Sequence, residues 1–246
     1  EFVNAINDLG GIFLDRPKNT NNEIKKFVNL GDNFVGHDLQ ALVESSDYII
    51  LAQPSHYFVK TVRKLKECGL QELRIPIILS PSRSFSTPYI WKELGEMYPV
   101  VSFSTCPYSC KAPRPDTAFI KRRKRNWIAS LEGAFTLSQI AELGQIFPQA
   151  IFNSRPITTT IGNIGAVFHP NTYLMNFKEI EKRKEENTVF SFYMDGIAAR
   201  PEVGEILEKV DQMRLNIAYT LGFDVFGLEG NPREEEWATI MSGIRL

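Results

Sequence analysis

The feature that most constrains the fold is a continuous apolar run, Tyr48-Ile49-Ile50-Leu51-Ala52, which is closed by Gln53-Pro54-Ser55. A run without polar alternation is typical of a strand that is covered on both faces, as in a parallel sheet. A helical pattern follows directly and ends at Gly69, and residues 75 to 79 form a second apolar run of strand length. Strand, helix and strand within about thirty residues predict a βαβ unit.

The alternation of helices and strands continues to about residue 155. Asp38 fits the N-cap of a short helix, and Thr136-x-x-Gln139 fits a capping box. Thr87-Pro88 is interpreted as an N-cap followed by a proline at the first helical position. The remaining strands expected in this part of the chain are residues 100 to 103 and 150 to 152.

Two segments of this part are less regular. Residues 1 to 36 mix a short apolar stretch with a polar run, and we expect a short strand and loops there. Residues 118 to 120 and 127 to 129 flank the basic run from Lys121 to Arg125, which predicts a hairpin with a basic turn. A basic run can bind phosphate or nucleic acid, but a solvated turn is favoured because few aromatic residues accompany it.

After residue 155 the pattern becomes helical. The strongest helix runs from Glu202 to Leu221, because its apolar residues recur at helical spacing between Pro201 and Gly222. Asp195-Gly196 is interpreted as a turn leading to that helix. The sequence therefore predicts an α/β domain over residues 1–155, followed by a helical domain over residues 156–246.

Charge and cysteine content limit the partners. The 28 basic and 29 acidic residues leave a formal net charge of -1, which gives no general attraction to nucleic acid or to an anionic membrane. No apolar run reaches the ~18 residues of a membrane span. Cys68, Cys106 and Cys110 are an odd number without metal-ligand spacing, so we expect no metal site and a reducing, cytoplasmic location.

Polar residues follow the expected strands at the point where each strand ends. Gln53, Pro54, Ser55 and His56 follow the first, and Ser80 and Thr105 follow the next two. Open α/β sheets bind their ligands outside the carboxyl ends of the strands, so these six are the candidates for contact with a dinucleotide. Ordinary strand-to-helix turns are the alternative.

The glycine fingerprint of dinucleotide-binding folds is missing. No Gly-x-Gly-x-x-Gly occurs in the 246 residues, although those glycines let the backbone approach a pyrophosphate. Either the fold is different, or the first strand and its loop precede Glu1. We favour the second interpretation, which makes the dinucleotide-binding domain a partial one.

The sharpest candidate for chemistry is the stretch Asn163-Ile164-Gly165-Ala166-Val167-Phe168-His169-Pro170. Proline often opens a helix, so His169 is expected at a helix start, where the macrodipole disfavours a cationic imidazole. A histidine can exchange protons near neutral pH, and Asn163 can orient a carbonyl or amide by hydrogen bonding. A structural histidine and a turn-forming asparagine are the alternatives.

Several stretches, taken in order, resemble the opine dehydrogenase family, which includes the octopine and nopaline dehydrogenases. The resemblance covers residues 38 to 225, and the stretch from Asn163 to Pro170 is its most specific part. The other matching stretches are residues 46 to 56, 78 to 84, 106 to 111, 192 to 196, and 211 to 222.

The resemblance implies a Rossmann-type domain followed by an all-helical substrate domain. It also implies reductive condensation of an α-keto acid with the amino group of an amino acid, with NADH or NADPH as the cofactor. His169 matches the catalytic histidine of the family. Asn163 matches an asparagine that helps to place substrate or cofactor.

Three departures from the family pattern bear on activity. The glycine fingerprint is absent, and Ser82-Arg83-Ser84 stands where the family has a glycine-rich loop. The family pairs its histidine with an aspartate that we expect beyond Leu246. These 246 residues alone are therefore expected to show little activity.

Two other functions remain open. A related two-domain dehydrogenase acting on a hydroxy acid would turn over without any amine. A catalytically inactive family member would bind a metabolite or a partner protein instead. The sequence is silent on the particular amino acid and keto acid, on NAD against NADP, and on oligomeric state.

Overall fold

A computed structural model of the chain describes residues 1–15, 26–33, 35–82, 84–122, 126–222 and 225. These residues fall into two compact units, Glu1–Pro156 and Ile157–Leu246. Arg83 and residues 123–125 of the basic run lie outside the described residues.

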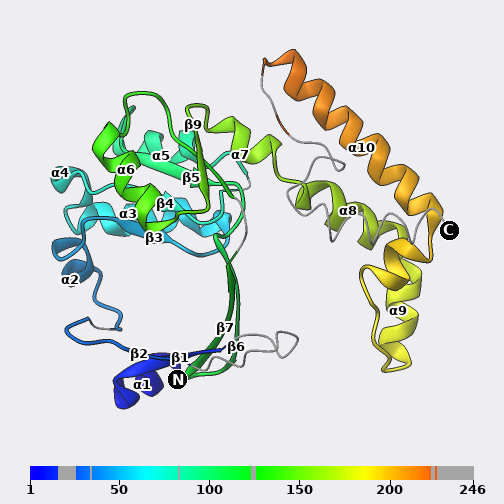
Figure 1. Ribbon diagram of the computed structural model, residues 1–246, viewed down its shortest axis with the longest axis horizontal. Coiled ribbons are helices and arrows are strands. Elements are labelled where there is room, and N and C mark those ends of the chain that lie inside the picture. The colour runs from blue at the N-terminus through cyan, green and yellow to red at the C-terminus, as the bar shows by residue number, and fades with distance from the viewer. Residues whose placement is uncertain (16–25, 34, 83, 123–125, 223–224, 226–246) are drawn as a thin grey trace. The chain divides into compact units, whose positions relative to one another are not determined.

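The first unit is built on a five-stranded sheet with the order β3-β4-β5-β8-β9 (Figure 1). The strands β3 (Ile49–Leu51), β4 (Ile77–Leu79) and β5 (Val100–Phe103) are parallel, which confirms the predicted βαβ arrangement. β8 (Asn126–Ala129) runs antiparallel to β5, and β9 (Ala150–Asn153) is parallel to β8.

Helices cover both faces of this sheet. Alternate side chains of a strand point to opposite faces, and accordingly Ile77 and Leu79 belong to one apolar cluster while Ile78 belongs to another. The first cluster includes residues of α2, α3, α4 and α5, and the second is closed by α6. The bounds of these helices are Leu39–Glu44, Phe58–Glu67, Leu70–Leu73, Thr87–Leu94 and Leu137–Ile146.

The helix starts follow the expected capping chemistry. The Asp38 carboxylate accepts a hydrogen bond from the Ala41 amide at 3.0 Å. Thr136 and Gln139 form the predicted capping box at the start of α6. Each bond satisfies an amide that the helix itself leaves without a partner. The α5 helix differs slightly, because it begins at Thr87 with Ser86 as the N-cap.

The prediction that β3 is covered on both faces is only partly correct. Ile50 is 49% exposed, whereas Ile78, its register partner on β4, is 1% exposed. β3 is the edge strand of the described sheet, and α6 packs over the middle strands rather than over it. The continuous apolar run therefore predicts the position of this strand correctly, but it does not predict that one face of the strand is exposed.

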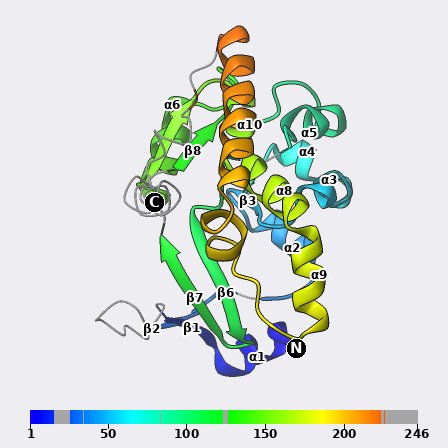
Figure 2. The same ribbon diagram turned by 90° about the vertical axis from the view of Figure 1, so that its right-hand side faces the viewer.

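A second sheet has the strand order β2-β1-β7-β6 (Figure 2). Its bounds are Gly11–Asp15 for β1, Lys26–Asn29 for β2, Tyr108–Arg114 for β6 and Thr117–Arg122 for β7. A helix, α1 (Phe2–Leu9), precedes β1 where the sequence predicted only a strand and loops. Phe2, Ile6 and Leu9 recur at helical spacing in α1, a signal that sequence reasoning overlooked in this short segment.

The predicted hairpin around the basic run is wrong. β7 pairs with β6 and β1, whereas β8 pairs with β5 and β9, so the strands on either side of residues 123–125 lie in different sheets. The true hairpin is β6–β7. Sequence reasoning missed it because β6 is exposed along almost its whole length and has no apolar alternation.

The second unit is helical, as predicted for this part of the chain. Its core joins Val167 and Phe168 with Ile197, Val203 and Leu207. The elements are α7 (Ile157–Ile161), α8 (Gly165–Met175), α9 (Phe177–Glu185), a π-helical turn η2 (Met194–Ala198) and α10 (Pro201–Thr220).

The predicted turn at Asp195-Gly196 is this π-helical turn. The Gly196 amide donates to the Ser191 carbonyl at 3.2 Å, and the Ala199 amide donates to the Met194 carbonyl at 2.9 Å.

Within the described part of the chain, no helix is both long enough and apolar enough to cross a membrane.

Candidate active site

The loops that follow β3, β4 and β5 lie at one edge of the main sheet, because the three strands are parallel. They carry the six residues expected to contact a cofactor. Gln53, Pro54, Ser55 and His56 follow β3, Ser80 follows β4, and Thr105 follows β5.

The structure brings the first two loops into contact through hydroxyl groups. Ser84 Oγ donates to Ser55 Oγ at 2.8 Å and lies 3.5 Å from Ser86 Oγ. The backbone amide of Ser80 donates to the Leu51 carbonyl at 3.0 Å. Sequence reasoning did not select Ser84, because its partner lies 29 positions away and no local pattern links them.

The remaining residues of the first loop differ in what they can offer. Gln53 Nε2 donates to Thr61 Oγ1 at 2.7 Å, so this amide secures the loop to α3. His56 and Pro54 are exposed, and the His56 ring lies against Tyr57 with 4.1 Å between the ring centres.

The third loop is held by Asn126, a residue that sequence reasoning missed. Ser104 Oγ donates to Asn126 Oδ1 at 3.1 Å, and Asn126 Nδ2 donates to the Thr105 carbonyl at 2.7 Å. Asn126 is only 2% exposed. It therefore fixes the position of Thr105 from the neighbouring strand. Its place at the start of a strand carries no recognisable motif.

His169 lies in α8, in the second unit, and not at a helix start. The helix begins at Gly165, and Pro170 is inside it. Hydrogen bonds from the Ala166 amide to the Asn163 carbonyl at 3.1 Å and from Val167 to Ile164 at 2.9 Å start the helix earlier than predicted. The expected effect of the macrodipole on His169 is therefore wrong, since that effect is confined to the first turn.

Aromatic side chains surround the His169 ring, which belongs to an exposed residue. Its centre is 4.9 Å from that of Phe192 and 6.4 Å from that of Tyr173. Phe192 contacts Tyr173 at 5.3 Å and Tyr193 edge-on at 5.0 Å. Phe192 and Tyr193 come from the segment that leads into η2. The sequence marked that segment as part of the resemblance but did not place it beside His169.

Asn163 lies at the corner between α7 and α8. The residue is 9% exposed, and its side-chain amide makes no hydrogen bond to another described residue. The backbone carbonyl of Asn163 accepts a hydrogen bond from the Ala166 amide, and its backbone amide donates to the Thr160 carbonyl at 3.0 Å. A primary amide carries both donors and an acceptor, so this side chain has the chemistry to bind a carbonyl or a carboxylate.

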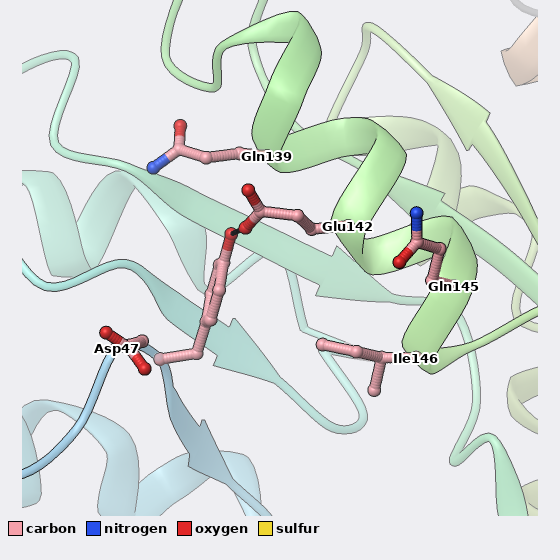
Figure 3. A pocket seen from close by; sticks show the side chains of 6 residues that line it. Asp47, Gln139, Glu142, Gln145 and Ile146 are labelled. Atoms are coloured by element: carbon pink, nitrogen blue, oxygen red, sulfur yellow. Dashed lines mark hydrogen bonds between the residues drawn. The ribbon is translucent and has the colours of Figure 1, made fainter.

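A shallow pocket lies elsewhere in the first unit, lined by residues of α6 and of the segment before β3 (Figure 3). Tyr48 Oη donates to Glu142 Oε2 there at 2.5 Å. Burial, together with this bond to the Glu142 carboxylate, raises the pKa of Tyr48 to about 12. The pocket is at the amino end of β3, opposite to the loops described above, and none of the candidate residues lines it. Its lining residues are Asp47, Tyr48, Gln139, Glu142, Gln145 and Ile146.

No cluster of three or more His, Cys, Asp or Glu side chains is found in the described part of the chain. Cys68, Cys106 and Cys110 form no disulfide bond.

Comparison with known proteins adds sequence and fold relationships. Residues 153–232 match the family model described as NAD/NADP octopine/nopaline dehydrogenase, alpha-helical domain. The chain is 27% identical over 193 residues to an opine dehydrogenase of Arthrobacter sp. (strain 1C), a match that covers 76% of this chain and 52% of that protein. The chain thus spans about half the length of this relative.

Solved structures share the fold at low identity. A structure of octopine dehydrogenase with NADH and pyruvate matches with a TM-score of 0.57 and 12% identity, over 72% of this chain and 46% of the other. A putative ketopantoate reductase from Ralstonia solanacearum MolK2 matches with a TM-score of 0.59 and 12% identity, over 98% and 73%. The α/β unit, the helical unit with its family match and the curated relative agree with one another. The helical unit thus matches the octopine/nopaline dehydrogenase helical-domain model, and the chain is similar in sequence to an opine dehydrogenase.

Proposed function

We propose that the complete gene product condenses an α-keto acid with the amino group of an amino acid and reduces the resulting imine. The observation that carries this proposal is that the family-matched helical unit holds both an exposed His169, packed against Phe192, and Asn163, which lies just before the same helix. Loss of water joins the two substrates as an imine, and the addition of a hydride and a proton yields a secondary amine.

His169 is proposed to exchange a proton with the substrate. Imidazole can give and take a proton near neutral pH, and the aromatic side chains around the ring restrict its orientation. Asn163 is proposed to hold a substrate carboxylate or carbonyl, because a primary amide has both donors and an acceptor.

The cofactor is proposed to be NAD or NADP, whose reduced form, NADH or NADPH, would supply the hydride. Ribose and phosphate oxygens need hydroxyl and amide groups, and the loops after β3, β4 and β5 present them at one sheet edge. Ser55 and Ser84 are already linked there, which supports cofactor contacts by Ser55, Ser80 and Thr105 and by the exposed Pro54 and His56. Gln53 is proposed to support this loop from behind.

The reaction is tested by measuring NADH and NADPH oxidation by the complete gene product, with mass spectrometry of the product. We expect oxidation only when a keto acid and an amino acid are both present, and a product containing both. Equal oxidation with the keto acid alone would instead identify a hydroxy-acid dehydrogenase. Cofactor or metabolite binding without turnover would identify an inactive family member.

The role of His169 is tested with His169→Ala. We expect kcat to fall by roughly 10²- to 10⁴-fold, the usual contribution of a well-placed proton-transfer group, while the cofactor dissociation constant stays the same. His37→Ala is the matched control, because His37 is an exposed histidine of the first unit and should leave both quantities unchanged. Full activity of His169→Ala would remove His169 from the mechanism.

A further inference from the structure

The helix α10 carries a buried pair of opposite charges that the mechanism above does not use. Nε and Nη2 of Arg214 donate to Oδ1 of Asp211 at 2.8 and 2.6 Å. The two side chains are 11% and 7% exposed. Removing two charges from water is costly, and a buried ion pair is often no more stabilising than apolar side chains of the same size. The pair therefore calls for an explanation other than stability.

The third contact of Arg214 reaches out of its own helix. Nη1 donates to the backbone carbonyl of Ile161 at 2.7 Å, 53 positions earlier in the chain. Ile161 is the last residue of α7, and the carbonyls at a helix end have no partner inside the helix. Arg214 thus ties α10 to the end of α7, while Asp211 fixes the plane of the guanidinium group.

The backbone beyond Ile161 turns tightly into Asn163. The Gly162 amide donates to the Thr158 carbonyl at 2.8 Å, and a Cβ on Gly162 would lie 2.8 Å from that same oxygen. No side chain fits at this position without a shift of the backbone. The tie at Ile161 therefore acts only two residues from Asn163, through a segment that has little room to move.

We propose that Arg214, oriented by Asp211, is a positioning residue that fixes the direction of the Asn163 amide toward substrate. This inference rests on the proposed function, in which Asn163 holds a substrate carboxylate or carbonyl. It explains why an arginine occupies the position: a planar guanidinium contacts the carboxylate and the carbonyl together, whereas a lysine ammonium is a single point charge.

The substitution Arg214→Lys separates positioning from stability. Because it keeps a positive charge for Asp211, we expect an unfolding midpoint close to that of the wild type. A lysine side chain cannot, however, maintain these three N–H contacts. In the complete gene product, kcat/KM for the keto acid and the amino acid should fall by roughly 10- to 100-fold, because small displacements of a positioning group have effects of this size. KM for the cofactor should not change.

Two further measurements guard the interpretation. Amide hydrogen exchange in the 246-residue chain should accelerate at residues 161–166 in Arg214→Lys. Millimolar methylguanidinium should slow that exchange again in Arg214→Ala if the latter folds. Val203→Ala is the control for general weakening of this unit. Val203 is a fully buried core residue of α10, and its side chain takes no part in the hydrogen bonds to Asp211 or Ile161.

The outcomes distinguish this inference from the proposed function. Faster exchange at residues 161–166 with a selective loss of kcat/KM supports the positioning role. Wild-type exchange at those residues, or an equal loss of kcat/KM in Val203→Ala, overturns it. If the wild-type protein shows no condensation at all, the proposed function fails. Hydrogen exchange at residues 161–166 tests the tie to Ile161 separately, and unchanged exchange in Arg214→Lys would overturn that tie.

Discussion

Single side chains show how burial and hydrogen bonding alter chemistry in this protein. Tyr48 donates to Glu142, and Tyr98 donates to the carbonyls of both Leu70 and Ile75 at 2.8 Å. Burial raises the pKa of both tyrosines above the usual value. In each case the folded protein favours the neutral phenol, which can donate a hydrogen bond.

This preference predicts a loss of stability at high pH. A group whose pKa is higher in the folded state binds its proton more tightly there, so the free energy of unfolding falls as pH rises above the unfolded value of ~10. For Tyr48 the decline runs from there to about 12. Chemical denaturation as a function of pH should show a shallower decline in Tyr48→Phe, with the rest due to Tyr98. An unchanged slope would contradict the role of the Tyr48–Glu142 bond.

At the residue scale, sequence could select candidates but not their partners. Asn163 and His169 were selected because they match a local motif. Asn126 was missed, and Ser84 and Phe192 were noted only as parts of longer stretches, because each acquires its contacts from a residue distant in sequence. Local chemistry is visible in a sequence, whereas contacts across the fold are not.

At the scale of elements, predictions succeeded where apolar periodicity or capping was strong. The strands β3, β4 and β5 are runs of apolar residues, and α10 has apolar residues at helical spacing. The exposed strand β6 had no such signal, whereas the short helix α1 had one, in Phe2, Ile6 and Leu9, that was overlooked. The start of α8 was misplaced because a proline, which usually marks a helix start, lies within this helix.

Pro170 offers a test of how α8 supports His169. An interior proline lacks an N–H donor and costs a helix about 3 kcal/mol or more, so Pro170→Ala should raise the unfolding midpoint. The same change should lower kcat, because proline bends a helix and His169 is the residue directly before it. Thermal melts and steady-state kinetics of the complete gene product test both parts. A more stable variant with wild-type kcat would show that the proline does not direct His169.

At the scale of the whole molecule, the two units have separate cores. The two apolar clusters around the main sheet contain residues up to Phe152, and the cluster of the helical unit begins at Ile164. No residue belongs to a cluster of both units among those described. Each unit therefore has its own source of hydrophobic stabilisation.

Separate cores predict separate responses to a cavity. Leu207 is 3% exposed, and Leu207→Ala should destabilise the helical unit by about 2–5 kcal/mol. Hydrogen exchange should accelerate in residues 157–222 and stay unchanged in β4 and β5. Leu137→Ala is the matched control, since Leu137 is 86% exposed and its truncation leaves no cavity. Equal acceleration in both units would show that they unfold together.

The β6–β7 hairpin has a consequence for the order in which contacts can form. Its strands are joined by a tight connection, with Arg114 paired to Thr117, whereas β5 and β8 pair across the whole segment that contains the hairpin. The entropy lost in closing a loop grows with its length, so the short loop closes at lower cost. Once formed, the hairpin shortens the free chain between β5 and β8. An exposed ribbon that adds little to the core thereby makes it easier for the chain to complete the central sheet.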